Sequence, residues 1–575
     1  MTLARHASRS LQASFAARLE HAPDRRALAF LDASGTCSWR TMEALWRDAA
    51  SEAAALRELG LQRRDVCVLV LPSGELCATL LTAVLLSGAV PLLVASPVVR
   101  GQHTSLFDIL ARVIRKTRPR LVIATPEFVR DSAAMLGSMP TGTRLVGWPA
   151  ATAAAASEGF PVIADGDDLA ALQLTSGTTA FPRICMWNHR GILAAIDGMS
   201  QSMAITEHDI CLNWTPLYHD MGLVNNFLSC LVTGVPLVMM SPIDFVKRPF
   251  TWLRGLSTTG ATVTWSPNFG FALAAQRVTD AELAGIRLDH VRAFWNAAER
   301  IHFETFAAFY ERFRTVGVRL DSLKTNFGCA ENVGGATFSD PHGPIVVEHV
   351  DRRKLHGSGI AAPVRVEEDA TDVVSVVGVG RASPGVRVRI LSKSGRDLQD
   401  GRVGELALDT PSRMLGYLGN ARATTRALGV GVLRTGDLGY RRGEEIFWVG
   451  RVRERLTVRG RKLDPSDFEA VLLQVSGLRS GCFAVFGVDD AGRGTQKVVI
   501  LAEIRDGAAS DAAAIAAEIR NRVFQRLGVR VDDVQLVPAN TLTKTSSGKR
   551  RHRYFRNWYI KGQPGRFDNA EGAKS

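Results

Sequence analysis

The segment LQLTSGTTAFPR, residues 172–183, places four hydroxyl side chains and a glycine between an apolar run and a proline. A turn of this kind presents hydroxyl and backbone N–H donors on one concave surface, and a glycine allows anionic oxygens to approach closely. The segment lacks the Gly-Lys-Ser/Thr ending of a Walker P-loop. It predicts a phosphate-binding turn of another class, although an ordinary polar turn has the same composition.

Size and charge set the limits for the rest of the chain. The 575 residues exceed what one hydrophobic core usually holds, and 46% apolar with 22% charged residues is typical of a folded protein. The net charge of +13 favours acidic partners or phosphate-bearing substrates, while a general arginine bias explains it equally well. We expect no nucleic-acid partner, because no nucleic-acid-binding module is recognisable.

Cysteine usage and hydropathy indicate a cytoplasmic protein. The eight cysteines are scattered without a C-x-x-C pair, so neither a zinc site nor a disulfide framework is expected. The first 26 residues lack the apolar centre of a signal peptide. The apolar run 76–99 is interrupted by Pro91, and we expect a short buried helix followed by a buried strand rather than a transmembrane segment.

The hydrophobic pattern predicts an α/β protein. Strand-like runs at 65–72, 120–125 and 235–240 alternate with helical patterns such as 303–313, which favours layered helices and largely parallel sheets. From about 381 to 450, short strands alternate with glycine turns and predict a β-rich subdomain.

The C-terminal part predicts a separate α+β domain. Its pattern is helix, strand, strand, helix, strand, at 466–475, 482–487, 497–503, 511–526 and 533–537. We therefore expect a large N-terminal body over 1–450, a small domain over 451–560 and a disordered tail over 561–575.

Seven further motifs follow the turn in order: NWTPLYHDMGL (213–223), NAAER (296–300), NFGCAEN (326–332), GELALDTPSRMLGY (404–417), RTGDLG (434–439), GRVRERLTVRGRKLDPSDFE (450–469) and LTKTSSGKRR (542–551). This series resembles the adenylate-forming superfamily of acyl-CoA synthetases, luciferases and nonribosomal-peptide adenylation domains, over about residues 10–560. The likeness is closest to fatty acyl-AMP ligases, because TPLYHDMGL and ATVTWSPNFGFAL (261–273) resemble signatures of that branch.

The resemblance implies a two-step reaction. ATP and a carboxylic acid, in this branch a fatty acid, give acyl-AMP and pyrophosphate, with Mg²⁺ as the metal. The acyl group then passes to the phosphopantetheine thiol of an acidic acyl carrier protein, in polyketide, nonribosomal-peptide or lipid biosynthesis. Because a carboxylate is a weak nucleophile and the α-phosphate is anionic, catalysis must neutralise charge and align the reactants. An acyl-CoA ligase and a non-catalytic nucleotide-binding protein remain alternatives.

A long connection supports the acyl-AMP ligase branch. About 50 residues separate Glu331 from GRASPG (380–385), and the excess lies near 347–372. It resembles the insertion that restrains the C-terminal domain in acyl-AMP ligases and disfavours free CoA, although loop insertions can also be incidental.

The resemblance assigns a role to each nucleotide-binding residue. The turn 175–179 and Arg183 would hold the β- and γ-phosphates, Glu331 would bind Mg²⁺, Asp437 and Arg451 would contact the ribose, and Phe327 would stack on the adenine where relatives have tyrosine. Backbone groups of Ala298 and Glu299 would contact the adenine edge. The full set is Thr175, Ser176, Gly177, Thr178, Thr179, Arg183, Ala298, Glu299, Asn326, Phe327, Gly328, Asp437 and Arg451.

Three further residues would act in catalysis or domain motion. Lys549 matches the lysine that reaches the α-phosphate and the acid carboxylate, a task suited to a flexible point charge. His219 matches a gate beside the acyl carboxylate, or it is a structural histidine. Arg453 lies at the hinge about which a mobile C-terminal domain would rotate. The nearby basic clusters are either solvated faces or a rim that attracts the carrier protein.

Several positions depart from the family pattern. Ala180 and Ile184 replace glycines and Arg183 replaces a lysine, while Ala297 and Arg300 replace Gly and Pro in the NAAER segment. The identity of the acid is left open, and aryl or amino acids are not excluded. Four tryptophans either border the acyl tunnel or pack in the core: Trp187, Trp214, Trp265 and Trp295.

Overall fold

The computed structural model describes residues 10–32, 34–96, 103–136, 139–148, 163–175, 182–365, 373–429, 431–452, 454–458, 461–490, 495–505, 511–544 and 550–562. Two large sheets dominate the N-terminal body. The larger has the strand order β17-β14-β13-β12-β11-β9-β10-β1-β2, and the five central pairings from β13 to β1 are parallel. The expectation of an α/β fold with largely parallel sheets is confirmed.

The strands of this sheet are β1 (Arg26–Leu31), β2 (Cys37–Thr41), β9 (Cys211–Asn213), β10 (Leu237–Met240), β11 (Val263–Pro267), β12 (Ala293–Ala297), β13 (Leu323–Cys329), β14 (Gly334–Phe338) and β17 (Arg381–Ala382). Helices that pack around it include α1 (Leu11–His21), α6 (His189–Ser202), α7 (Ser229–Thr233), α8 (Pro242–Lys247), α9 (Phe250–Thr259), α10 (Asn268–Arg277) and α11 (Phe303–Phe313). The helix predicted at 303–313 is α11, with the same bounds.

The second sheet has the order β20-β8-β7-β4-β3-β5-β6. Its strands are β3 (Val66–Val70), β4 (Val90–Leu93), β5 (Leu121–Ala124), β6 (Arg144–Gly147), β7 (Leu169–Leu174), β8 (Ile184–Asn188) and β20 (Gly416–Tyr417), with α2 (Met42–Glu58), α3 (Glu75–Leu86), α4 (His103–Thr117) and α5 (Pro126–Leu136) beside them. The apolar run 76–99 forms α3 and β4, as expected. Among the described helices, none combines the length and the apolarity needed to cross a membrane.

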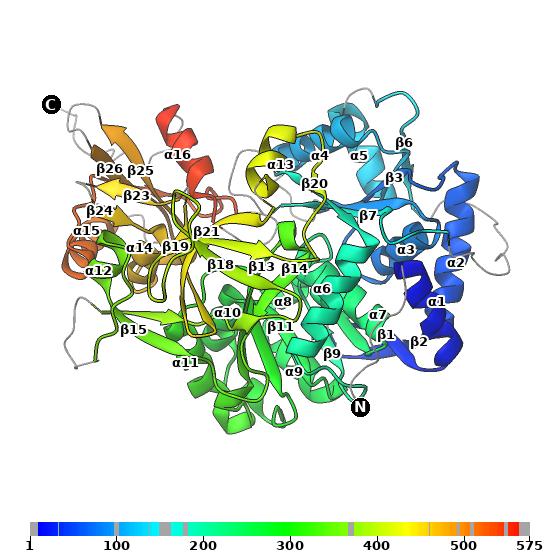
Figure 1. Ribbon diagram of the computed structural model, residues 1–575, viewed down its shortest axis with the longest axis horizontal. Helices are drawn as coiled ribbons and strands as arrows, with labels where there is room; N and C mark the ends of the chain where they lie inside the picture. The colour runs from blue at the N-terminus through cyan, green and yellow to red at the C-terminus, as the bar shows by residue number, and fades with distance from the viewer. Residues whose placement is uncertain are drawn as a thin grey trace.

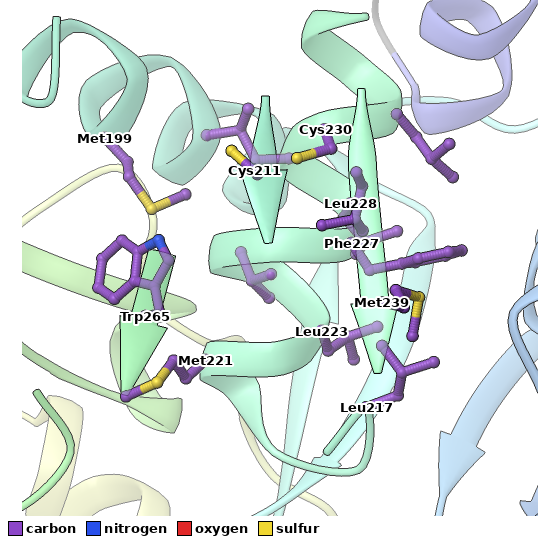
Figure 2. Close-up of a cluster of buried hydrophobic side chains, with 14 of the residues drawn as sticks. Met199, Cys211, Leu217, Met221, Leu223, Phe227, Leu228, Cys230, Met239 and Trp265 are labelled. Atoms are coloured by element: carbon purple, nitrogen blue, oxygen red, sulfur yellow. The ribbon is translucent and has the colours of Figure 1, made fainter. Parts of the chain in front are cut away.

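A π-helix begins at Met221, inside the LYHDMGL segment (217–223). Helix η1 (Met221–Leu228) is buried along its whole length, and it contacts α6, α7, β9 and β14 (Figure 2). Figure 2 shows Phe227 and Leu223 near Met239 of β10, with Cys211 of β9 on the other side. π-helices are rare and occur mostly at functional sites, because they widen a helix locally. The sequence pattern did not predict this geometry.

The subdomain predicted from about 381 to 450 is largely β-structure. It contains the antiparallel sheet β18-β19-β21-β22, formed by β18 (Arg387–Leu391), β19 (Gly404–Asp409), β21 (Leu433–Arg442) and β22 (Glu445–Arg451). A helix, α13 (Ala421–Leu428), interrupts it, because the Asn420 side chain caps the N–H of Ala423. The long connection forms the hairpin of β15 (Val347–Asp351) and β16 (Val373–Val377), and the short helix α12 (Arg352–Gly357) follows β15.

The C-terminal domain has a hydrophobic core of its own. Its elements are β23 (Leu456–Val458), β24 (Arg461–Leu463), α14 (Pro465–Leu472), β25 (Leu478–Asp490), β26 (Thr495–Ile504), α15 (Ala512–Leu527), β27 (Asp533–Val537) and α16 (His552–Ile560). The predicted order of elements is correct, although β25 is longer than expected. In Figure 1 these elements lie at the opposite side of the molecule from α1 and α2. The expected tail falls, from residue 563 onward, outside the described residues.

Candidate functional site

One cavity of about 1150 Å³ receives residues from almost every motif. It lies at the carboxyl ends of the parallel strands β11, β12 and β13, where α/β folds usually bind their ligands. Its walls include Thr175, Arg183, His219, Ala298, Glu299, Asn326, Phe327, Gly328, Glu331, Asp437 and Arg451. Residues far apart in the sequence therefore face a single space.

The opening segment forms the end of a hairpin between β7 and β8. At its neck the Thr175 N–H donates to the Arg183 carbonyl oxygen at 2.8 Å, and the Arg183 N–H donates to Thr175 Oγ1 at 3.0 Å. Ser176, Gly177, Thr178, Thr179 and Ala180 lie outside the described residues. Ile184 is fully buried in β8. Both ends of the turn are thus fixed at the cavity wall.

Glu331 lies in the 3₁₀ turn η5 (Ala330–Asn332), directly after β13. Tyr417 Oη donates to Glu331 Oε1 at 2.6 Å, and the Arg183 guanidinium lies 4.9 Å from the centre of the Tyr417 ring. Burial, together with the charge of Glu331, raises the pKa of Tyr417, so its hydroxyl stays a donor. This pair joins the neck of the phosphate turn to the carboxylate that the sequence assigned to the metal.

The backbone around Glu331 is held under strain. Val333 is fully buried and has a φ of 54°, a left-handed conformation that is unfavourable for a β-branched residue. The indole Nε1 of Trp187, on β8, donates to the Ala330 carbonyl oxygen at 2.7 Å. Strain of this kind costs about 1–3 kcal/mol and is concentrated at functional sites. The surrounding packing therefore fixes the direction of the Glu331 side chain.

The residues at this wall suit a magnesium ion. The second carboxylate oxygen of Glu331 has no hydrogen-bond partner in the described part of the chain, and Glu331 lines the same cavity as Thr175 and Arg183. The described residues contain no group of three His, Cys, Asp or Glu side chains that could hold a metal ion. Mg²⁺ usually binds one or two carboxylates together with substrate phosphates, which is the arrangement that Glu331 allows.

Asp437 is buried on β21, with only 3% of its surface exposed. Its Oδ1 accepts hydrogen bonds from Trp448 Nε1 and from Arg451 Nε, both at 3.1 Å. Asp437 and Arg451 are also paired across the β21–β22 ladder, and the carboxylate raises the pKa of the arginine. Because both donors use Oδ1, Oδ2 is left to accept from a diol.

The NAAER and NFGCAEN segments form the facing wall. Phe327 is on β13 and is 8% exposed. Ala298 has a φ of 73°, which turns the chain at the end of β12. Glu299 Oε1 accepts from the N–H of Phe269 at 2.6 Å, so this side chain binds the start of α10 and the backbone faces the cavity.

Asn326 and Gly328 flank Phe327 for structural reasons. Asn326 Nδ2 donates to the carbonyl oxygens of Phe327 and Thr337, each at 3.1 Å. A side-chain carbon at Gly328 would lie 2.3 Å from the Gly334 carbonyl oxygen, so this position requires glycine. Both residues keep the Phe327 ring and the strand end in place.

His219 also lines the cavity, where it precedes the π-helix η1. Its Nδ1 lies 2.7 Å from Asp220 Oδ1 and 3.2 Å from the N–H of Met221. The ring is therefore held on one edge by its neighbours, and its other nitrogen is the one available to a substrate.

The C-terminal domain covers the other side of the cavity. Lys544, Arg550 and His552 line it, together with Asp464, Ser466 and Glu469 of α14 and its cap. Lys549 and Arg453 lie outside the described residues. The neighbours of Lys549 thus reach the cavity.

The sequence analysis did not identify three residues of this site. They are Tyr417, Trp448 and Arg300, the last of which contacts Ser466 of α14. Each lies inside a quoted motif or strand, but none carries a local signal for its partner. The four tryptophans that were possible tunnel residues are all buried, and none of them is among the residues that line the cavity. Trp265 and Trp295 stack on each other with ring centres 5.5 Å apart.

Comparisons with known proteins place this chain among AMP-binding enzymes. The family model for AMP-binding enzymes matches residues 15–418. A long-chain-fatty-acid–AMP ligase of Mycobacterium marinum is 31% identical over 407 residues, covering 66% of this chain and 68% of that protein. A medium-chain-fatty-acid–acyl-carrier-protein ligase of Moorena producens is 29% identical over 406 residues, covering 67% of both chains.

A solved structure of related enzymes has the same fold as this chain. A chain described under fatty acyl-adenylate ligases from E. coli and L. pneumophila superposes with a TM-score of 0.89 at 27% identity, covering 97% of this chain and 99% of that one.

Proposed function

The chain belongs to the AMP-binding enzyme family and is an adenylate-forming ligase; from this premise we propose that it activates a fatty acid and passes it to a carrier protein. In the first step an oxygen of the acid carboxylate attacks the α-phosphorus of ATP. The bond from that phosphorus to the bridging oxygen breaks, giving acyl-AMP and pyrophosphate. In the second step the phosphopantetheine thiol attacks the acyl carbon, and AMP leaves.

The convergence of the motifs on one cavity carries this proposal. Thr175, Arg183, Glu331, Phe327 and Asp437 all line this cavity, although they come from three separate motifs of the chain. Mg²⁺ held by Glu331 would supply positive charge to the leaving pyrophosphate. No single residue must transfer a proton in the first step, so positioning and charge neutralisation account for catalysis.

Each wall would have a distinct task. The Asp437 carboxylate would accept hydrogen bonds from the ribose hydroxyls, with Arg451 and Trp448 holding its Oδ1. The Phe327 ring would stack on the adenine, and the backbone at Ala298 would contact the base edge. His219, held by Asp220, would border the acid. We assign Lys549 to the α-phosphate and the acid carboxylate, because its neighbours Arg550 and Lys544 reach the same space.

A carrier protein is favoured as acceptor by the positive rim of the cavity. Arg479, Arg505, Lys544, Arg550 and Arg553 all contribute to its lining from the C-terminal domain. An acidic carrier would be attracted to such a surface. The relative from Moorena producens is named for transfer to an acyl carrier protein, which points in the same direction.

We also propose that the small domain, from about residue 451, rotates about Arg453 between the two steps.

The eight cysteines are unpaired, which suits a reducing cytoplasm.

The test is pyrophosphate exchange with Mg-ATP across a panel of fatty, aryl and amino acids. The second step is followed separately with holo carrier protein and with free CoA. Acid-dependent exchange and labelling of the carrier are expected. Rapid thioester formation with CoA would identify an acyl-CoA ligase, and ATP binding without exchange for any acid would identify a non-catalytic protein.

A further inference from the structure

Asp467 of α14 is a buried carboxylate that two arginines and a histidine surround, and burial lowers the pKa of this histidine, His356. Only 3% of the Asp467 side chain is exposed. Asp467 Oδ1 lies 3.5 Å from Arg300 Nη1 and 3.7 Å from Arg352 Nη1, and its Oδ2 lies 3.3 Å from His356 Nε2. Arg300 Nη1 also donates to the hydroxyl of Ser466, the preceding residue.

All three surrounding side chains come from the N-terminal body. Arg300 ends the NAAER segment, two residues after Ala298 in the adenine wall. Arg352 and His356 belong to α12, which packs against β24 of the C-terminal domain. Asp467 therefore connects the nucleotide wall and the long connection to α14.

Burial and charge show that this contact is an ionic one. Burial alone would raise the pKa of Asp467, but His356, Arg300 and Arg352 lower it below its ordinary value. A buried ion pair adds little net stability compared with apolar packing, yet removing one partner leaves an uncompensated charge. Its effect is to favour one relative orientation of the two partners.

The same helix also holds the segment that follows Lys549. Glu469 Oε2 accepts from Arg550 Nη1 at 2.7 Å, and Glu469 Oε1 lies 3.1 Å from His552 Nε2. The Arg550 guanidinium stacks 4.7 Å from the centre of the Phe483 ring. Helix α14 thus contacts the N-terminal body through Asp467 and the cavity-lining residues 550 and 552 through Glu469.

We propose that Asp467 is a positioning residue for the acyl-adenylation step. Its ion pair with Arg300 docks the C-terminal domain against the adenine wall, and Glu469 on the same helix places Arg550 and His552 in the cavity. Asp467 itself is not among the described residues that line the cavity. The assignment of this contact to the first of two steps rests on the proposed function.

A double-mutant cycle tests the contact. The variants are Asp467→Asn, Arg300→Met and the double variant. Asp489→Asn is the control, because Asp489 is an exposed carboxylate whose side-chain contacts, with Arg556 and Gln496, stay within the described part of the C-terminal domain. We expect each single variant to lower kcat for acyl-AMP formation about tenfold. We expect the double variant to be no slower than the slower single variant, because the two residues share one interaction.

Two readouts separate positioning from a general loss of structure. The KM for ATP and the rate of transfer from synthetic acyl-AMP to holo carrier protein are expected to stay within about twofold of the wild type. Arg300→Lys, which keeps the charge, is expected to regain most of the lost kcat. Independent losses in the double variant, equal losses in both steps, or the same loss in Asp489→Asn would overturn the proposal.

Small-angle scattering tests the docking without any activity. Asp467→Asn is expected to have a larger radius of gyration than the wild type, with an unchanged circular dichroism spectrum. An unchanged radius would contradict the proposal. If the wild type forms no adenylate with any acid, the proposed function fails, and scattering of Asp467→Asn and Arg300→Met still decides whether this contact docks the domain.

Discussion

The two sides of the cavity are held in place by different forces. We call the N-terminal lining from Thr175 to Arg451 the floor, and the C-terminal lining from Asp464 to His552 the roof. Floor residues lie at strand ends above a continuous apolar core, and Asp437 is fixed by a β-ladder and by Trp448. The roof has a separate core and meets the floor through buried charges such as Asp467.

This contrast indicates how the parts divide their work. An apolar core opens only at a high cost, because its surfaces are then exposed to water. Charged groups are solvated well when they separate, so an ionic contact can form and break more easily. A rigid floor suits a nucleotide that remains bound through both steps, and an ionically docked roof suits a domain that changes position between them.

The largest effect is expected for the roof, at Lys549. Lys549→Ala should lower kcat for acyl-AMP formation by about 10²–10³-fold, because it removes a charge from the transition state. ATP binding and transfer from synthetic acyl-AMP should be largely retained. Single-turnover assays of both steps measure this, with Lys497→Ala as a control, since Lys497 pairs with Asp490. Equal losses in both steps would contradict the role of Lys549.

The second largest loss of activity is expected for a floor variant, Glu331→Gln. It preserves the shape of the side chain but removes the charge that binds the metal, and should lower kcat/KM for Mg-ATP by about 10²-fold. Titration with Mg²⁺ should show a higher requirement for the ion. Glu444→Gln, at a side chain that is 80% exposed, is the control. An unaltered Mg²⁺ dependence would exclude Glu331 as a metal ligand.

Tyr417→Phe tests whether the hydrogen bond to Glu331 supports metal binding in the floor. It removes only the hydroxyl that donates to Glu331 Oε1 at 2.6 Å. Partners of metal ligands usually contribute 10–100-fold to metal affinity, and for this variant we expect about a tenfold higher Mg²⁺ requirement with an unchanged KM for the acid. The same Mg²⁺ titration is the measurement. A change in acid specificity instead would mean that Tyr417 acts on the substrate.

The last prediction concerns stability rather than activity, through the pH dependence of stability in the roof. Burial, followed by the charge of Asp467, raises the pKa of Asp464 to about 6. A raised pKa means that the stability from the neutral form is present at low pH and is lost as the pH rises through about 6. Asp464→Asn stays neutral, so its stability relative to the wild type should rise by about 2 kcal/mol between pH 4 and pH 8. Denaturant unfolding at both values measures this, and a constant difference would mean that Asp464 is ionised throughout.

Much of the fold and the site was predictable because their signals are local or ordered. The helix over 303–313 has an apolar repeat that fixes its bounds, and the order of the motifs implied a common cavity. The contact between Tyr417 and Glu331 was not predictable, since the two residues are 86 positions apart and meet only through the register of β20 on β8. The same holds for Arg300 and Asp467, which are 167 positions apart.

Other differences reflect geometry that residue types do not encode. The pattern of 221–228 fits any buried helix, and residue types alone do not distinguish a π-helix from an α-helix there. The helix α13 interrupts the β-rich subdomain because one asparagine caps it.

The hydrogen bond between Trp448 and Asp437 links the fluorescence of one tryptophan to the nucleotide site. Of the tryptophans in the described part of the chain, Trp448 is the one that lines the cavity. Its indole N–H donates to the carboxylate that would receive the ribose. Arrival of a nucleotide would change the polarity around this ring, and the intrinsic fluorescence of the unlabelled protein would then follow occupancy in real time.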